Sequence, residues 1–249
     1  KHTNVTSFKK DIHVTFKLAT TPKDNRKTAV FYLDEKNSKL VYVGGKVKDS
    51  NITFNASHFS SYVAIEGNKS FTDLPSWSKD YIEVLASRGI INGKTEELYG
   101  SSNPIKRGEF AVLVARAFAL DTSEYKGIFK DVPASMTWGA KEIEAANKAG
   151  IINGFSATEF KPNENIKRQE MAAMIIRALK LKNPSIGTKD SNLAAFQDAK
   201  TISSYAKAEV ELAYALGIIS GYEVANGSEF RPHEQATRAQ AAKMLYLML

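Results

Sequence analysis

The chain has 249 residues, of which 43% are hydrophobic and 24% charged, so its composition is that of a globular protein with one large domain or two smaller ones. It contains no cysteine, which excludes disulfide bonds, thiolate metal sites and a cysteine nucleophile. The net charge is +7, but most of the surplus lies before Gly67, and we therefore expect no extended basic surface for nucleic acid. No apolar run is long enough for a membrane span.

The first 67 residues predict a small all-β module. Apolar and polar residues alternate with period two over residues 14–18, 31–33, 40–42 and 52–54, and turn-forming residues separate these segments. We predict an antiparallel β-sandwich, or part of one, over residues 1–67. The junction to the next region is expected at residues 69–71.

From residue 68 onward one pattern occurs three times. Its centre is a Gly-Ile-Ile-x-Gly segment at residues 89–93 and 150–154, which returns at residues 217–221 with the same two glycines and isoleucines. A Phe-x-Asp motif precedes each segment, and its aspartates are Asp73, Asp131 and Asp198. A second aromatic residue follows each aspartate: Trp77, Trp138 and Tyr205. An arginine follows each segment: Arg107, Arg168 and Arg238. Three copies predict a pseudo-threefold assembly of repeats over residues 68–125, 126–190 and 191–249.

Each repeat is predicted to contain two helices. Asp73 and Pro75 are a helix-start signal with the aspartate as cap. Gly89, Gly150 and Gly217 are placed to end the first helices in the left-handed conformation. The second helices begin at the arginines and carry apolar stripes at helical spacing: Phe110, Leu113, Val114 and Ala117; Met171, Met174, Ile175 and Ala178; Ala241, Met244, Leu245 and Met248. These stripes are expected to bury one another in a three-helix bundle, with the methionines in the core and no cofactor site.

The three arginines break a rule of helix design. A cation in the first turn opposes the helix dipole by roughly 0.3–1 kcal/mol. The third residue of each helix is able to cap its start, and these residues are Glu109, Glu170 and Gln240, the last in a capping box with Thr237. A helix start with spare N–H groups and an adjacent arginine is suited to bind a carboxylate or phosphate. The alternative is a structural ion pair between each arginine and an aspartate of a Phe-x-Asp motif.

The second aromatic residues also allow two interpretations. Trp77, Trp138 and Tyr205 either pack against the short first helix or form a partly exposed platform on which a sugar ring stacks. Both interpretations can hold for different edges of one ring.

The ordered, threefold combination of these motifs from residue 71 to residue 249 resembles the surface-layer homology (SLH) family. Its further signature, Phe-x-Pro followed by Ile-Thr-Arg-Ala-Glu, is partly kept at residues 160–170 and 230–240. The first repeat has Tyr99-Gly100-Ser101 in place of Phe-x-Pro, and lysine replaces the threonine in the first two repeats. The resemblance implies a mainly α fold with a separate all-β module, in which the repeats form a pseudo-threefold, three-pronged helical domain.

The resemblance also implies a function at the bacterial cell surface. Members of this family anchor proteins non-covalently to a secondary cell-wall polysaccharide, often one with a pyruvate ketal, in grooves between adjacent repeats. The three arginines would then meet the anionic group, with the three aspartates as groove partners. The backbone N–H groups of Gly93, Gly154 and Gly221 would lie close to the sugar. We interpret the chain as a mature fragment with a cargo domain N-terminal to it, and its β module resembles the stalk domains of Gram-positive surface proteins.

The sequence also bears on two other classes of function, an enzyme and a protein scaffold. The histidines, His2, His13, His58 and His233, are scattered, and neither a nucleophile elbow nor a phosphate-binding loop occurs, so we predict no enzyme and no metal site. The main alternative is a protein–protein scaffold or S-layer assembly module without carbohydrate recognition. Carbohydrate binding should depend on the arginines and on an acidic substituent of the polymer, whereas a scaffold should not.

Overall fold

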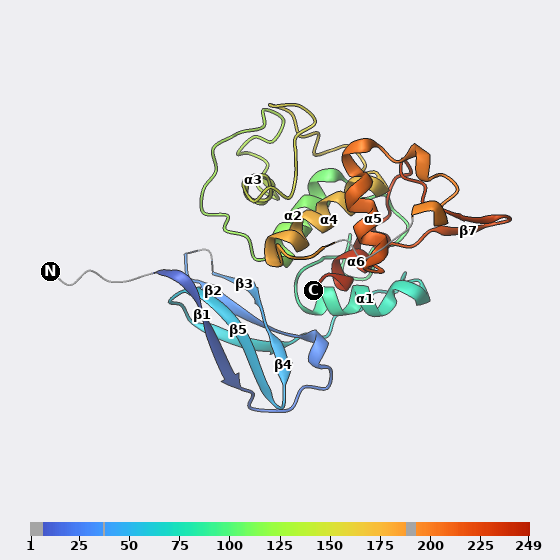
Figure 1. Cartoon of the computed structure of the whole chain (residues 1–249). Helices are drawn as coiled ribbons and strands as arrows, with labels where there is room; N and C mark the ends of the chain where they lie inside the picture. The colour runs from blue at the N-terminus through green and yellow to red at the C-terminus, as the bar shows by residue number, and fades with distance from the viewer. Residues whose placement is uncertain (1–6, 37, 188–192) are drawn as a thin grey trace. The chain divides into compact units, whose positions relative to one another are not determined.

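The computed structural model describes residues 7–36, 38–187 and 193–249, and side chains from residue 11 onward (Figure 1). A β-rich N-terminal region precedes a helical region, as predicted, and the chain divides into two compact units, residues 1–99 and 100–249. The divisions placed at residues 67 and 125 remain predictions. The division at residue 190 and His2 lie outside the described residues.

The β-rich region consists of two antiparallel sheets of three strands each. The strand order of the first sheet is β1 (Ser7–Lys17), β5 (Asn51–His58) and β4 (Lys46–Lys48). The strand order of the second sheet is β3 (Lys39–Gly44), β2 (Thr28–Asp34) and β6 (Tyr62–Glu66). Val30 of β2 packs in one buried cluster with Ile52 and Phe54 of β5, so the two sheets share a core. The alternating segments predicted four of these strands. β4 has only three residues and β6 carries consecutive apolar residues, so neither shows the period-two signal.

The first unit joins this β-rich region to α1 (Ser76–Ser87) through close contacts. Gly67 donates its N–H to the carbonyl of Lys27 (3.2 Å), and the Lys27 ammonium lies 3.3 Å from the Glu83 carboxylate of α1. Arg88, directly after α1, donates to the carbonyl of Gly45 (3.0 Å). The junction between strand and helix is therefore a packed segment of the unit.

Replacing Gly67 by alanine is expected to destabilise the first unit by about 1–3 kcal/mol, the usual cost of overpacking. A Cβ at this position would lie 2.0 Å from the carbonyl oxygen of Ser87, so the backbone would have to move. Gly187→Ala is the matched control, because its Cβ would have no atom closer than 3.8 Å. Thermal unfolding followed by circular dichroism should show a lower midpoint for Gly67→Ala alone, and equal midpoints for the two variants would contradict the expectation.

The helical region has two α-helices per repeat, as predicted. In chain order they are α1, α2 (Arg107–Ala117), α3 (Ala140–Lys148), α4 (Arg168–Lys182), α5 (Lys207–Ala215) and α6 (Arg238–Leu247), with 3-10 turns η2 (Leu193–Ala195), η3 (Ala199–Thr201) and η4 (Ser204–Ala206) before α5. The third repeat also carries a hairpin that was not predicted, β7 (Tyr222–Val224) and β8 (Gly227–Glu229). Its two-residue loop is Ala225-Asn226, and Gly227, with a φ of 139°, is the first residue of β8.

The ends of the first helices follow the prediction, but the start of α1 does not. Gly89, Gly150 and Gly217 have φ values of 68°, 72° and 69°, the left-handed conformation that glycine adopts without strain. Asp73 was predicted to be the N-cap of α1, and this is wrong: the helix begins at Ser76, and Pro75 stands at the N-cap. The Asp73 carboxylate instead accepts the N–H of Tyr99 at 2.7 Å.

The second helices, α2, α4 and α6, contact one another pairwise (Figure 1). Their apolar stripes are buried, apart from the half-buried Leu113, and the methionines are core residues as predicted.

A closed ring of backbone hydrogen bonds lies just before these helices. Ile105 donates to the carbonyl of Ala236 (3.0 Å), Ala236 to that of Ile166 (2.9 Å), and Ile166 to that of Ile105 (3.0 Å). All three residues are fully buried. Each repeat thus donates one backbone hydrogen bond of this ring to a second repeat and accepts one from the third.

Candidate functional site

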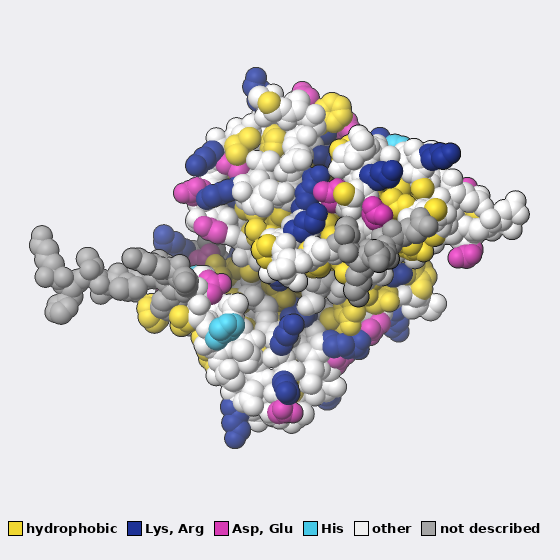
Figure 2. Space-filling model, in the orientation of Figure 1, with side chains coloured by type: hydrophobic (Ala, Val, Ile, Leu, Met, Phe, Trp, Pro, Cys, Tyr) yellow, Lys and Arg dark blue, Asp and Glu magenta, His cyan; other side chains and the backbone are white. Residues whose placement is uncertain are grey.

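Arg107, Arg168 and Arg238 occupy the first positions of α2, α4 and α6, as predicted, and are buried, with 8%, 8% and 7% of their surfaces exposed. Arginine is almost never so buried unless its charge is paired. On the face shown in Figure 2, Lys and Arg side chains are interspersed with Asp, Glu and uncharged groups. The three motif arginines are therefore set apart from the ordinary surface charge by their burial.

The helix starts have no spare N–H groups at their first two positions, which corrects the prediction that these amides are open to an anion. Arg107 donates its backbone N–H to the carbonyl of Glu164 (2.8 Å), and Gly108 donates to that of Pro162 (2.9 Å). The corresponding pairs at α4 and α6 are Arg168–Glu234, Gln169–Pro232, Arg238–Asn103 and Ala239–Ser101. Carbonyl groups of another repeat thus satisfy these amides, a long-range arrangement that local sequence does not reveal.

The third residue of each helix caps its start as predicted. Glu109 accepts the N–H of Lys106 (3.0 Å) and Glu170 accepts that of Lys167 (2.9 Å). In the third repeat Thr237 and Gln240 exchange hydrogen bonds of 3.1 and 3.3 Å, which is a complete capping box.

Arg107 is held by groups of the second repeat. Its Nε donates to the carbonyl of Phe160 (3.2 Å), and its Nη1 donates to the Glu170 carboxylate (2.9 Å). The guanidinium carbon lies 4.9 Å from the centre of the Phe160 ring. Its carboxylate partner is therefore the capping glutamate of α4, and the predicted alternative of an ion pair with a Phe-x-Asp aspartate is wrong for this arginine.

Arg168 is held in the same way by the third repeat but has a different polar partner. Its Nε donates to the carbonyl of Phe230 (2.8 Å) and its Nη2 to that of Ser220 (3.0 Å). The guanidinium lies over the rings of Tyr222 and Phe230, at 4.7 and 5.0 Å. Among the described residues, no carboxylate lies within 4.0 Å of it. Burial lowers the pKa of Arg168, because desolvation disfavours the charged form.

The aspartates of the Phe-x-Asp motifs hold the loops that receive these arginines. Asp131 accepts the N–H groups of Phe160 and Lys161, at 2.9 and 2.6 Å. Asp198 accepts those of Phe230 and Arg231, at 2.8 and 2.7 Å. The same phenylalanines offer their carbonyl groups to Arg107 and Arg168, so each aspartate is a positioning residue for an arginine of the preceding repeat.

The residue after each of these aromatic residues has a left-handed backbone. Lys161 and Arg231 have φ values of 62° and 57°, which cost a non-glycine residue roughly 1–2 kcal/mol. Gly100, which stands at this position in the first repeat, has a φ of 77°. The departure of the first repeat from Phe-x-Pro therefore keeps the backbone conformation of this turn.

The second aromatic residues are half-exposed: Trp77 at 51%, Trp138 at 43% and Tyr205 at 53%. Trp138 packs on Gly108, where an added Cβ would lie 2.8 Å from the indole. Gln169, which is 1% exposed, contacts the Tyr205 hydroxyl at 3.4 Å, and burial raises the pKa of this phenol. The Trp138 and Tyr205 rings thus each contact a buried residue of the preceding repeat and are still half-exposed.

Gly93, Gly154 and Gly221 are required by packing. A Cβ on them would lie 2.5–2.7 Å from the rings of the Phe-x-Asp phenylalanines, Phe71, Phe129 and Phe196. It would also lie within 3.0 Å of backbone carbonyl oxygens or, at Gly221, 2.0 Å from the Ser228 hydroxyl. These close contacts explain structurally why glycine occupies the three positions, whether or not the glycines also contact sugar.

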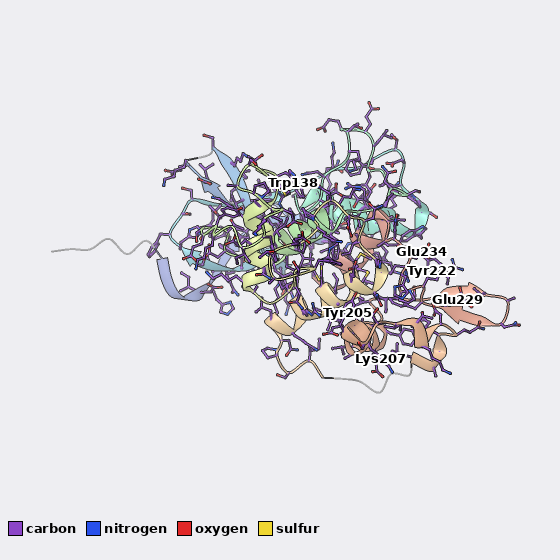
Figure 3. All side chains as sticks on the ribbon, turned by 90° about the horizontal axis from the view of Figure 1, so that it is seen from above. Trp138, Tyr205, Lys207, Tyr222, Glu229 and Glu234 are labelled. Atoms are coloured by element: carbon purple, nitrogen blue, oxygen red, sulfur yellow. The ribbon has the colours of Figure 1, made fainter. Side chains whose placement is uncertain are left out.

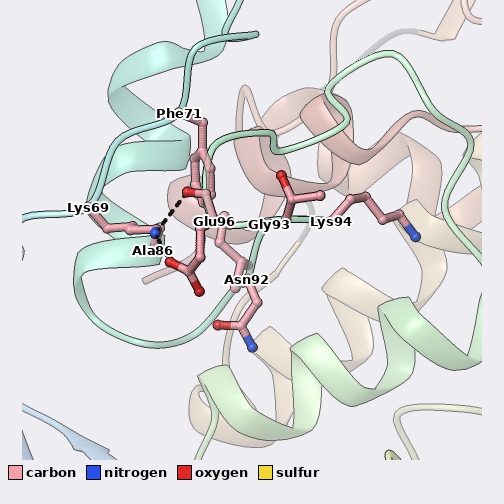
Figure 4. A pocket seen from close by; sticks show the side chains of 9 residues that line it. Lys69, Phe71, Ala86, Asn92, Gly93, Lys94 and Glu96 are labelled. Atoms are coloured by element: carbon pink, nitrogen blue, oxygen red, sulfur yellow. Dashed lines mark hydrogen bonds and ion pairs between the residues drawn. The ribbon is translucent and has the colours of Figure 1, made fainter.

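A pocket of about 450 Å³ lies beside Gly93 in the first unit (Figure 4). Lys69, Phe71 and the segment 91–96 line it. The Lys69 ammonium lies 2.6 Å from the Glu96 carboxylate, and its hydrogen bond lowers the pKa of Glu96. An ion pair thus occupies one wall of the pocket.

Sequence reasoning missed Gln169, Tyr222 and Arg231. Two guanidinium groups lie over the Tyr222 ring, with the carbons of Arg231 and Arg168 at 4.5 and 4.7 Å from its centre. Figure 3 shows Tyr222 close to Glu229 and Glu234, which pair with Arg231. The sequence offered two weak signals for these residues. Gln169 stands where the other repeats have Gly108 and Ala239, and an Asn-Gly pair follows Tyr222 by four residues.

Within the described part of the chain no group of three or more His, Asp or Glu side chains is arranged to hold a metal ion. No helix of that part combines the length and the apolar surface that crossing a membrane requires.

Comparison with known proteins identifies the repeats. The S-layer homology domain family matches at residues 70–111, 128–172 and 195–242, which is more than half of the chain. An amylopullulanase of Thermoanaerobacterium thermosulfurigenes is 41% identical over 99% of this chain and 13% of its own length. The surface-layer 125 kDa protein of Lysinibacillus sphaericus and the S-layer protein EA1 of Bacillus anthracis are each 31% identical, over 69% and 75% of this chain.

The chain spans only 13%, 14% and 21% of the lengths of these three relatives. The threefold match to the family covers the Phe-x-Asp motifs and the starts of α2, α4 and α6 in every repeat. The chain therefore belongs to the S-layer homology domain family, whose place is the cell wall or S-layer surface.

Proposed function

We propose that the helical region anchors its protein to the cell wall by binding an anionic secondary cell-wall polysaccharide, such as one with a pyruvate ketal. The observation that carries this proposal is the buried arginine at the same position of three helices. Arg107 and Arg168 are each framed by a phenylalanine carbonyl of the next repeat. The residue after each of these arginines contacts a half-exposed aromatic residue. Gly108 packs against Trp138, and Gln169 is hydrogen-bonded to the Tyr205 hydroxyl.

In this proposal each binding groove lies between two neighbouring repeats. The arginine donates parallel hydrogen bonds to the acidic substituent, which a planar guanidinium does well. Trp77, Trp138 and Tyr205 supply an open ring face on which a sugar stacks. Asp73, Asp131 and Asp198 hold the receiving loops, and the backbone at Gly93, Gly154 and Gly221 lines the groove. Glu109, Glu170 and Gln240 fix the helix starts and set the local charge.

We also propose the finer architecture that the repeats imply. α2, α4 and α6 form a three-helix bundle on a pseudo-threefold axis through the backbone ring of Ile105, Ile166 and Ala236, and the first helices form the three prongs. The pairwise contacts of these helices and the closed ring support this arrangement. The β-rich region is a small sandwich that connects the anchor to a cargo domain on its N-terminal side. We assign no catalytic role to the helical region.

Sedimentation with isolated cell walls tests the proposal. We expect the protein to pellet with native walls and to stay in solution once the non-peptidoglycan polymer has been extracted. In a separate assay the protein should bind the purified polymer. It should not bind polymer from which acid treatment has removed the pyruvate ketal. Equal binding to the intact and ketal-free polymers would contradict recognition of an anionic sugar. Partner binding without wall polysaccharide would support the scaffold alternative.

A further inference from the structure

We propose that Gln240 makes Arg168, and not Arg107, the arginine of this pair that takes the carboxylate of an acidic sugar. This inference rests on the proposed function and adds to it a residue that determines which site is used. The two arginines occupy equivalent positions and are equally buried, at 8% exposed. They differ in the third residue of the second helix that belongs to the following repeat. This residue is Glu170 of α4 for Arg107 and Gln240 of α6 for Arg168.

The Arg107 site is already neutral. Its guanidinium lies 2.9 Å from the Glu170 carboxylate, whose side chain is 21% exposed while that of Arg107 is 9% exposed. Glu170 is also fixed in place, because its other oxygen accepts the N–H of Lys167 at 2.9 Å. A ligand carboxylate at this arginine would face a second carboxylate in a partly desolvated setting, where like charges repel strongly. Glu170 therefore disfavours an acidic ligand here.

The Arg168 site keeps its positive charge. Its hydrogen-bond partners among the described residues are the carbonyls of Phe230 and Ser220 and the hydroxyl of Tyr222, all of them uncharged. The carboxylates of Glu234 and Asp198 act on the guanidinium electrostatically, but neither is hydrogen-bonded to it or forms an ion pair within 4.0 Å. A carboxylate brought by a ligand would supply the direct counter-ion that a buried charge favours. Three of the five N–H groups of the guanidinium have these partners, which leaves two for a ligand.

Gln240 also prepares a second donor for the same ligand. Its Oε1 accepts the N–H of Thr237 (3.1 Å), and its Nε2 donates to the Tyr222 hydroxyl oxygen at 2.7 Å. The Arg168 Nη1 approaches the same oxygen at 3.5 Å. Because the Tyr222 oxygen accepts the hydrogen bond from Gln240, the Tyr222 O–H is able to donate to a carboxylate beside Arg168. A glutamate at position 240 would accept that O–H and pair with the guanidinium, as Glu170 does with Arg107.

The test exchanges charge at these two positions with almost no change of shape. Isothermal titration calorimetry measures binding of a methyl hexoside that carries a 4,6-linked pyruvate ketal, with its methyl ester as the uncharged probe. Gln240→Glu is expected to weaken binding of the acid at least tenfold at one site, and Glu170→Gln to add one site. Glu142→Gln removes a carboxylate that pairs with Arg116 at 3.1 Å and should bind like the wild type.

Gln240→Ala separates charge from contact. It removes the hydrogen bond to Tyr222 without adding a carboxylate, so its loss of affinity should be smaller than that of Gln240→Glu. Unchanged binding of the acid by Gln240→Glu, or an equal loss for both substitutions, would overturn the role of Gln240. If the wild type binds the acid no better than its ester, the proposed function fails as well, and this outcome is distinct from the first.

Discussion

Replacing Arg168 by alanine is expected to weaken binding to the acidic wall polymer by roughly 3 kcal/mol, about a hundredfold, because a charged hydrogen bond contributes about 1.5–3 kcal/mol. The guanidinium is buried, and no carboxylate of the described residues lies within 4.0 Å of it. Arg168→Lys keeps the charge but loses the planar pair of donors, so its affinity should lie between those of the wild type and the alanine variant. Titration with purified polymer measures all three.

Arg177→Ala is the matched control for this experiment. Arg177 belongs to the same helix, is partly buried and pairs with Glu209 at 3.7 Å, so its removal changes the net charge by the same amount. We expect Arg177→Ala to bind the polymer like the wild type. Equal losses for Arg168→Ala and Arg177→Ala would show that binding follows the total charge of the domain and contradict a discrete arginine site. Thermal unfolding of each variant separates lost binding from lost structure.

Gly154→Ala is expected to destabilise the helical region by about 3 kcal/mol or more. A Cβ would lie 2.2 Å from the carbonyl oxygen of Ser156, 2.7 Å from the Phe129 ring and 2.9 Å from the carbonyl oxygen of Glu159. Two of these neighbours are backbone atoms, so relief requires the whole turn to shift, and overpacking of this kind typically costs 1–3 kcal/mol or more. Chemical denaturation measures the free energy of unfolding directly.

Gly150→Ala provides the comparison within the same motif. Its Cβ would meet no atom within 4 Å, but its φ of 72° is unfavourable for alanine by roughly 1–2 kcal/mol. The two glycines thus serve different purposes, close packing at residue 154 and backbone conformation at residue 150. A larger loss of stability at Gly150 than at Gly154 would contradict this assignment.

Local rules predicted the elements well. The left-handed glycines at residues 89, 150 and 217, the helix starts at the three arginines and the buried stripes of the second helices all follow from spacing and capping preferences over a few residues. β4, β6 and the hairpin β7–β8 were not predicted: β4 and β7–β8 have strands of only three residues, and the apolar residues of β6 are consecutive.

The surroundings of the arginines were not predictable in the same way. The amides at the helix starts, which a local view leaves free, are satisfied by carbonyl groups of residues far away in the sequence. The carboxylate beside Arg107 is Glu170, 63 positions away, and the local view suggested an aspartate instead. Such partners depend on how the repeats pack, and only the folded chain shows that Glu170 lies beside Arg107 and that Gln240 bonds to the Tyr222 hydroxyl near Arg168.

Nitrogen-15 NMR of the arginine side chains tests the central assignment most directly. During titration with the pyruvate-ketal hexoside, the Nε–H and Nη–H signals of Arg168 are predicted to shift and saturate with the calorimetric affinity, while those of Arg107 stay in place. The uncharged ester should leave both sets unchanged. Saturating binding of the acid with no change at Arg168 would contradict the account.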